Sequence, residues 1–354
     1  MHCLVEARPA FADLPLSSLA IPGAENAGTF NLDPQAFDTQ SGSACTTLSA
    51  GSGSGAVKAL RFSTTQDQTV TAQLDDGVRW IDLHVGYNGG GNPVTGWRVV
   101  QNLYSSWPLS EYLDQVANWA AKHPTEAVVV DLSTICYDHN PNAAIDQGLW
   151  ANFATKSAEG AGPKTVADVA ALPSSFGGSV ASATLRKLTR RGHNVVVLIP
   201  AFAVGWRALP STYHVNPVRT TVPGRGGGGT TTVMRSDPKV APTSPAQFPL
   251  ANGELGAFPT KANPPLGSLR GRGLYVSQLA YELGGTSAAA QNMILTAFVG
   301  LIATQGIFHA WMSGLWDGAY GRILSRWGHA TNVVLADGID LGGFVGPVIA
   351  QNGR

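Results

Sequence analysis

An apolar segment from Val78 to Val85 carries two side chains that can do chemistry, Asp82 and His84. Gly77 precedes this segment and is typical of a helix C-terminus, and the segment has the length of a short buried strand. Residues two apart on a strand point to the same face, so Asp82 and His84 are expected side by side. A carboxylate and an imidazole are costly to bury unless polar groups meet them. We therefore expect both to line a cavity.

Further carboxylates and amides lie within or just after other short apolar segments. They are Glu25, Asn26, Asn102, Asp131 and Asp337. A helical pattern over residues 110–122, with an apolar face, lies between two of these segments. Alternating strands and helices predict an α/β fold with parallel strands that end together at one edge. These side chains are therefore predicted to gather at one mouth, together with Asp82 and His84.

The length allows one large α/β barrel with insertions, in a single domain over residues 1–354. A resemblance to known sequences in four of its segments implies that this barrel is of the TIM (β/α) type, distorted or incomplete. Its strands are predicted at 19–21, 78–85, 98–103, 127–133, 193–199, 273–279 and 332–336. Two stretches rich in Ser, Gly, Thr and Pro lack a periodic apolar pattern, and we expect long loop insertions at about 31–65 and 211–272. Residues 287–316 carry no Asp, Glu, Lys or Arg, but polar residues and glycines interrupt them. Helical cover for the barrel is favoured there over a membrane span.

The composition excludes some partners and indicates a compartment. Lys+Arg and Asp+Glu are equal at 23 each, and no basic run is present, so nucleic acid is not an expected partner. The three cysteines are too few for a disulfide scaffold, but a bridge between Cys45 and Cys136 can form in an oxidising compartment. Residues 1–16 lack the apolar core of a signal peptide. We expect a secreted or cell-envelope protein whose signal peptide is not part of this sequence.

Four segments, in order along the chain, carry a family resemblance. They are PLSSLAIPGAENAGTF (15–30), TTQDQTVTAQLDDGVRWIDLHV (64–85), VVQNLYSSWPLSEYLDQVANWAAKHPTEAVVVDLS (99–133) and NVVLADGIDLGGFVGPVIAQN (332–352). The first resembles the "IPGTHDSGTF" type of opening motif of phosphatidylinositol-specific phospholipases C. The second resembles the helix and "R-x-x-D-x-R" strand of that family. The chain is thus similar to the phospholipase C-like phosphodiesterases over its whole length.

The resemblance implies a changed set of catalytic residues. Glu25 and Asn102 stand where the family has its two histidines, and His84 stands where it has a phosphate-binding arginine. Asp82 and Asp337 match family aspartates. An amide cannot release a proton at a useful pH, so the two-histidine cyclising mechanism is not expected.

The predicted mouth offers oxygen donors that suit a hard divalent cation such as Ca²⁺ or Mg²⁺, with Ca²⁺ favoured. Glu25, Asn26, Asp82 and Asp131 are the predicted ligands. Calcium-dependent relatives also carry Asn after the first histidine and an acidic ligand on the second strand, which Asn26 and Asp82 match. The alternative interpretation is a purely structural cluster of shared protons and hydrogen bonds. A metal or ligand site is favoured over it, because so many polar groups gather where this kind of fold has its site.

Two functions fit these residues. The first is a metal-assisted phosphoric ester hydrolase acting on a phosphomonoester or a non-inositol diester, with Glu25 as general base, His84 as phosphate contact or proton donor, and Asp337 as a third catalytic residue. Asn26 and Asn102 would contact the substrate. The second is a catalytically inactive relative that binds a polyol or phosphate head group, or a protein partner. A lipid head group and transient membrane-surface contact are compatible with both, and His139 is a weaker candidate for a relocated general acid.

Overall fold

The structure is a computed structural model of the 354-residue chain. The residues that it describes are 9–37, 60, 63–89, 91–132, 134–136, 143–155, 164–171, 180–190, 192–200, 216–221, 231–235, 274–279, 332–340 and 343–353. Within these ranges, no helix combines the length and the apolar character that a bilayer span requires. The uncharged segment 287–316 lies outside the described residues.

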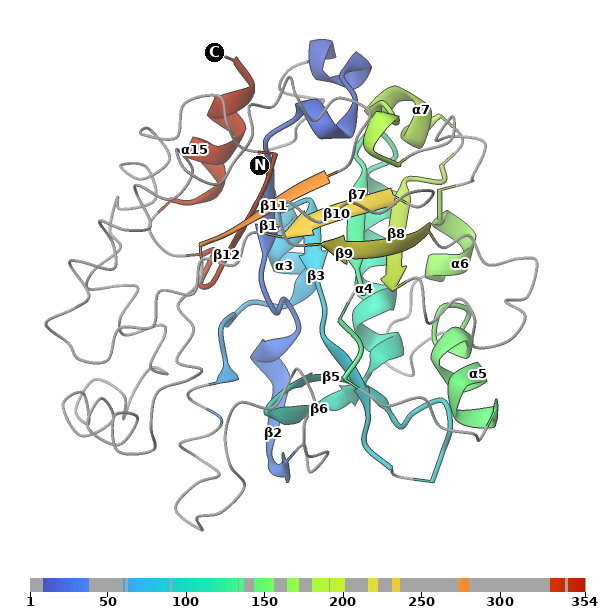
Figure 1. Ribbon diagram of the computed structural model, residues 1–354. Coiled ribbons are helices and arrows are strands. Elements are labelled where there is room, and N and C mark those ends of the chain that lie inside the picture. Colours follow the sequence, from blue (N-terminus) through green and yellow to red (C-terminus); the bar gives the residue numbers. More distant parts are fainter. Residues whose placement is uncertain are drawn as a thin grey trace, which may run out of the picture.

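Eight described strands pair in parallel all the way round a closed barrel (Figure 1). Their order is β1 (Ile21–Ala24), β12 (Val333–Ala336), β11 (Leu274–Leu279), β10 (Thr231–Arg235), β9 (Asn216–Thr221), β8 (Val195–Pro200), β7 (Val128–Asp131) and β3 (Trp80–Asp82). β1 pairs with both β12 and β3, which closes the sheet. The predicted α/β barrel is therefore confirmed, and its sheet is complete.

Alternate residues of the strands point into the barrel and out of it. One buried cluster draws described residues from six of the eight strands and fills the interior; its members include Ile21, Trp80, Val129, Leu198, Val276 and Leu335. The intervening residues, such as Ile81 and Val130, belong to an outer cluster with α3 (Val70–Asp75) and α4 (Leu109–Lys122). α4 is the helix predicted from its period, and its apolar face is buried as expected. The barrel interior and its helical cover thus follow from the alternation of side chains.

A second, antiparallel sheet lies beyond the barrel, below it in Figure 1. It contains β2 (Leu32–Phe37), β6 (Leu103–Pro108), β5 (Trp97–Gln101) and β4 (Val85–Tyr87), in that order. Two predictions are corrected by it. The strand predicted at 98–103 is not a barrel strand, because only Asn102 separates β5 from β6 and so short a link forces antiparallel pairing. The first part of the predicted insertion 31–65 is strand β2, which pairing with β6 stabilises.

The second predicted insertion, 211–272, is also corrected. It contains β9 and β10, two of the eight barrel strands. Their sequences, NPVRTT and TTVMR, are short and rich in Thr, and Pro and Gly surround them. The β-branched residues favour strands, but five or six residues with few apolar side chains give too weak a period to separate from a loop. Pairing with neighbouring strands determines the structure here.

Shorter helices complete the described part of the chain. Figure 1 shows α5, α6 and α7 on one side of the barrel and α15 on the other. The remaining elements are η1 (Pro9–Asp13), η2 (Leu16–Ser18), η3 (Thr29–Asn31), α5 (Ala143–Ala151), α6 (Val166–Val169), η5 (Val180–Ser182), α7 (Leu185–Thr189), α15 (Val345–Ala350) and η7 (Gln351–Gly353). Cys136 is disulfide-bonded. Cys3 and Cys45 lie outside the described residues, so the pairing of Cys45 with Cys136 stays a prediction.

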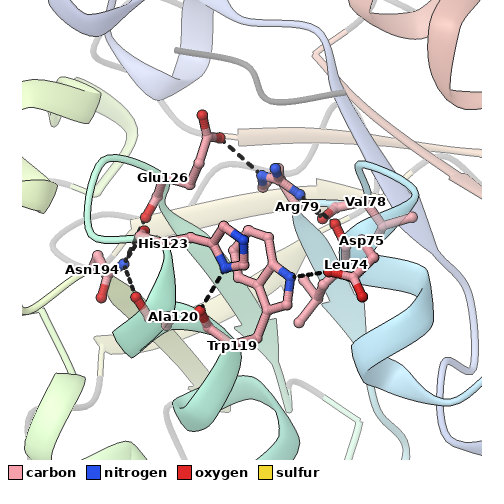
Figure 2. Close-up of polar contacts among 9 residues, drawn as sticks. All are labelled: Leu74, Asp75, Val78, Arg79, Trp119, Ala120, His123, Glu126 and Asn194. Atoms are coloured by element: carbon pink, nitrogen blue, oxygen red, sulfur yellow. Dashed lines mark hydrogen bonds and ion pairs between the residues drawn. The ribbon is translucent and has the colours of Figure 1, made fainter. Parts of the chain in front are cut away.

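A buried ion pair ties β3 to β7 at the end of the barrel where these strands begin (Figure 2). Arg79 Nε lies 3.0 Å from Glu126 Oε2, and the two side chains are 2% and 1% exposed. The same guanidinium donates from Nη1 to the carbonyl oxygens of Leu74 at 2.9 Å and Val78 at 2.8 Å. Its Cζ also lies 4.5 Å from the ring centroid of Trp119 on α4. One side chain thus joins both strands and two helices.

Candidate active site

Four carboxylates continue the inward-facing side of four adjacent barrel strands at the carboxyl ends of those strands. Side chains that fill the interior include Ile21 on β1, Trp80 on β3, Val129 on β7 and Leu335 on β12. Two residues on from Trp80, Val129 and Leu335, and four on from Ile21, the same inward-facing alternation leads to Asp82, Asp131, Asp337 and Glu25. We call these four residues the carboxylate row. Each lies at or just past the carboxyl end of its strand, where barrels of this type build their sites.

The strand register places the carboxylate row at one level. Asp82 pairs directly with Asp131. Ala24, just before Glu25, pairs with Ala336 of β12 and with Ile81 of β3. Glu25 therefore lies between Asp337 and Asp82, and neighbouring strands are about 4.8 Å apart. All four residues are at least nine-tenths buried, with exposures of 0%, 0%, 2% and 9% for Asp82, Asp131, Asp337 and Glu25.

Nitrogen donors approach two neighbouring carboxylates of the row, Asp82 and Asp131. Asp82 Oδ2 accepts the backbone N–H of Asn26 at 3.3 Å and lies 3.5 Å from His84 Nε2. Asp131 Oδ2 accepts from Trp80 Nε1 at 3.2 Å. The side chain of His84 is 16% exposed, whereas that of Asp82 is fully buried. The imidazole therefore connects a buried carboxylate with the solvent side of the mouth.

The segment that carries His84 departs from its prediction in one respect. Residues 78–85 were expected to form one strand, but β3 ends at Asp82 and β4 begins at Val85. His84 lies in the link between the barrel and the second sheet, where its carbonyl oxygen accepts the N–H of Val100 at 3.0 Å. Asp82 and His84 are nevertheless adjacent, as predicted, because their side chains meet.

Two asparagines at the mouth have left-handed backbone conformations. Asn26 has φ 48° and Asn102 has φ 58°, and among the described residues they alone combine a positive φ with a side chain. Asn tolerates this region better than most residues, and such conformations concentrate at functional sites. Both were predicted to contact substrate, and both are buried, with exposures of 5% and 4%. Asn102 Nδ2 donates to Ser63 Oγ at 3.0 Å.

Residues 63–66 are the part of the mouth that the sequence did not reveal. Ser63 contacts Asn102, and Thr65 Oγ1 lies 3.4 Å from the carbonyl oxygen of Glu25. Gln66 Nε2 donates to the carbonyl oxygens of Glu25 at 3.0 Å and Ala336 at 2.8 Å. This segment covers the end of the loop insertion predicted at 31–65 and the residue after it. Its polar run Ser-Thr-Thr-Gln is the kind that usually marks a surface, so its burial gave no signal in the sequence.

The donor chemistry of the row suits a hard cation, because carboxylate oxygens are the ligands that Ca²⁺ and Mg²⁺ prefer. Within the described part of the chain, no group of three or more His, Cys, Asp and Glu is already arranged to hold a metal ion. The predicted ligands Glu25, Asn26, Asp82 and Asp131 therefore lie at one mouth without forming a closed coordination shell. The cation stays a prediction.

Known proteins with similar sequences match part of this chain. It is 29% identical over 123 residues to "PI-PLC X domain-containing protein 1" of Danio rerio and 30% identical over 125 residues to the protein of that name from Mus musculus. Each match covers 34% of this chain, and 40% and 36% of the relatives. The alignments thus span less than half the length of these relatives. No family model matches the chain.

Solved structures match nearly the whole chain. Phosphatidylinositol-specific phospholipase C of Staphylococcus aureus superposes with a TM-score of 0.55 and 14% identity, covering 99% of both chains. The enzyme of Listeria monocytogenes gives a TM-score of 0.52 and 13% identity over 96% of this chain and 95% of that one. At this identity the structures establish the fold, and the sequence relatives carry the same family name.

The chain is similar to PI-PLC proteins in fold and, over a third of its length, in sequence.

The PI-PLC-like barrel brings most of the predicted site residues together. Glu25, Asp82, Asp131 and Asp337 share one level of the mouth, and Asn26 and His84 both approach Asp82. Asn102 lies between β5 and β6 and is linked to the row through Ser63 and the residues that follow it. His139, the weaker acid candidate, lies outside the described residues. At the two positions where the resemblance places the family's histidines, this chain has Glu25 and Asn102.

Proposed function

We propose that this PI-PLC-like protein hydrolyses phosphoric esters with the help of a divalent cation. The observation that carries the proposal is the carboxylate row, four acids on adjacent strands at one level of the barrel mouth. Ionised together, these acids would repel both one another and a phosphate. A cation among them would remove both repulsions, which supports a metal site at the row.

Glu25, Asp82 and Asp131, with the side-chain amide of Asn26, are the residues that would hold the cation, Ca²⁺ before Mg²⁺. When bound, the cation neutralises charge on a phosphate and makes a water molecule more acidic. The backbone N–H of Asn26 already bonds to Asp82 Oδ2 and so orients that carboxylate. The left-handed turn at Asn26 holds that N–H in place.

The chain's own residues would then move the protons. Glu25, the most exposed member of the row, would accept a proton from the water that attacks phosphorus, with Asp337 beside it orienting that water. As the bond between phosphorus and the leaving oxygen breaks, His84 would give that oxygen a proton. Asp82, 3.5 Å from His84 Nε2, would stabilise the protonated imidazole before the transfer.

Water as the nucleophile removes the need for an inositol hydroxyl next to the phosphate. The substrate class is therefore a phosphomonoester or a non-inositol phosphodiester, with a lipid head group included. Asn26 and Asn102 would contact its polar groups through their amides. The disulfide at Cys136 supports action in an oxidising compartment, in line with a secreted or cell-envelope protein that meets membrane surfaces transiently.

The test is hydrolysis of p-nitrophenyl phosphate and bis-p-nitrophenyl phosphate with Ca²⁺, Mg²⁺, Mn²⁺ or EDTA across pH. We expect cation-dependent turnover that EDTA abolishes and that Glu25→Gln and His84→Ala each lower at least about 100-fold, the scale of a lost acid or base. Turnover that both variants retain would place the chemistry elsewhere. No turnover, together with no cation-induced rise in melting temperature, would refute the hydrolase.

A second function is favoured by one specific observation, the lack of a closed group of three metal ligands among the described residues. On this view the PI-PLC-like protein is catalytically inactive and uses the same mouth to bind a polyol or phosphate head group, or a protein partner. Calorimetric titration with myo-inositol and glycerophosphoinositol separates the two. Saturable binding without turnover, lost in Asn102→Ala, would support the binding protein over the hydrolase.

A further inference from the structure

We propose that Gln66 is a positioning residue that fixes Glu25 and Asp337 relative to each other at the barrel mouth. The inference rests on the proposed function, in which Glu25 accepts a proton from the attacking water and Asp337 orients that water. It assigns a role to a residue outside the carboxylate row, directly after the loop insertion predicted at 31–65.

The side chain of Gln66 joins the ends of two strands. It is 1% exposed, and its Nε2 donates to the carbonyl oxygens of Glu25 at 3.0 Å and Ala336 at 2.8 Å. Its Oε1 accepts the N–H of Ile339 at 3.3 Å. These contacts reach the backbone of Glu25 and both sides of Asp337. One planar amide thus sets the distance between the two chain segments that carry the carboxylates.

The backbone of Gln66 is itself held by the turn that follows Glu25. Thr29 Oγ1 accepts the N–H groups of Thr65 at 3.0 Å and Gln66 at 3.1 Å, and donates to the carbonyl oxygen of Asn26 at 2.9 Å. The carbonyl oxygen of Thr65 accepts the N–H of Gly338 at 2.8 Å. The amide is therefore anchored to the mouth at both its ends, which a side chain acting only as filler would not require.

This amide acts where the strand ladder stops. The pairing of β1 with β12 runs from Ile21 to Ala24, and the N–H of Glu25 still bonds to Ala336 at 3.1 Å. Beyond that point the two segments must separate to open the mouth, and Gln66 links them there. Glutamine is suited to the task because it carries two donors and an acceptor, whereas glutamate would lose the donors that face two carbonyl oxygens.

The chain offers a matched control between the same two strands, β1 and β12, whose boundary we call the seam. Asn332 is fully buried, and its Nδ2 donates to the carbonyl oxygens of Leu16 at 2.8 Å and Leu19 at 2.7 Å. It joins the beginnings of β1 and β12, at the end of the barrel away from the carboxylate row. Asn332→Leu and Gln66→Met each replace a buried amide that bonds to two carbonyl oxygens by an apolar side chain of similar shape. Gln66→Met removes the bonds at the carboxyl ends of β1 and β12, whereas Asn332→Leu removes those at their beginnings.

The experiment compares the two variants in thermal stability, in kinetics with bis-p-nitrophenyl phosphate, and in ¹³C NMR titrations of the Glu and Asp side-chain carboxyls, with Glu25→Gln and Asp337→Asn giving the assignments. We expect both variants to lose stability. Only Gln66→Met should lower kcat, by about 10- to 100-fold with KM nearly unchanged, the scale of a misplaced catalytic group. Only Gln66→Met should shift the titration midpoints of Glu25 and Asp337.

The NMR readout separates this inference from the proposed function. If the wild type hydrolyses no ester, the hydrolase is refuted, and the titrations alone still decide the role of Gln66. Midpoints that stay at their wild-type values in Gln66→Met, or that move equally in Asn332→Leu, would show that Gln66 serves only stability. Equal losses of kcat in the two variants would overturn the inference as well.

Discussion

Removing the carboxylate of Glu126 should destabilise the barrel far more than removing an exposed partner of the same kind of ion pair. Arg79 and Glu126 are 2% and 1% exposed, and Arg79 Nε lies 3.0 Å from Glu126 Oε2 (Figure 2). Glu126→Gln keeps the shape of the side chain but leaves the guanidinium buried without its countercharge. Breaking a buried pair in this way costs about 3–5 kcal/mol of unfolding free energy.

The other contacts of Arg79 refine the expected size. Nη1 donates to the carbonyl oxygens of Leu74 and Val78, and Cζ lies over the ring of Trp119. These contacts survive in Glu126→Gln, so its cost should lie near the lower bound of about 3 kcal/mol. The double variant Arg79→Met/Glu126→Leu removes both charges but frees two carbonyl oxygens. Each unsatisfied group costs about 1–3 kcal/mol, so the double variant should cost less than the two single variants together.

Urea unfolding, followed by the fluorescence of the tryptophans, measures these differences. The control is Asp13→Asn, because Asp13 pairs with Arg186 at 2.6 Å but the two side chains are 65% and 64% exposed. Solvent screens such a pair, and we expect no measurable change at neutral pH. Arg186 lowers the pKa of Asp13, so any contribution of this pair is lost only as the pH falls through that lowered value. A Glu126→Gln variant as stable as Asp13→Asn would refute the reasoning.

Two further predictions concern residues at the seam and mouth. Gly23→Ala should lower the unfolding free energy by about 1–3 kcal/mol, because a Cβ at Gly23 would meet Leu335 Cδ2 and lie 3.1 Å from Trp80 Cβ inside the filled barrel. Chemical denaturation measures this difference, and an unchanged unfolding free energy would contradict the packing. Asn26→Gly should keep the fold at φ 48°, whereas Asn26→Val should cost about 1–3 kcal/mol more, because a β-branched residue is strained there. Comparing the melting curves of these two variants checks it, and equal stability would show that the left-handed turn is not required.

The sequence predicted the barrel where apolar segments were continuous. Buried runs such as Val128–Asp131 and Val195–Pro200 are strands as expected, because segments this apolar need a covered sheet. It missed β9 and β10, whose threonines and flanking prolines and glycines resemble a loop. It also placed the strand that contains Arg98 in the barrel, since period alone cannot distinguish a parallel strand from one arm of a hairpin.

The acidic residues of the candidate site could be predicted from the sequence, but the residues that hold them in place could not. Asp82 and Asp131 stand out because a carboxylate within an apolar run needs a partner. Gln66 and Ser63 could not be found in this way, because polar residues in a Ser/Thr-rich stretch are normally exposed. Only the folded chain shows that the loop returns to the mouth and bonds to Glu25 and Asn102.

The most direct test of the account is anomalous X-ray diffraction from crystals of this protein soaked in Mn²⁺. The account predicts a single strong peak at the barrel mouth, bounded by carboxylate oxygens of Glu25, Asp82 and Asp131, that disappears in Glu25→Gln crystals soaked in the same way. A mouth without a peak at saturating Mn²⁺, or acids of the row that point away from one another, would contradict it.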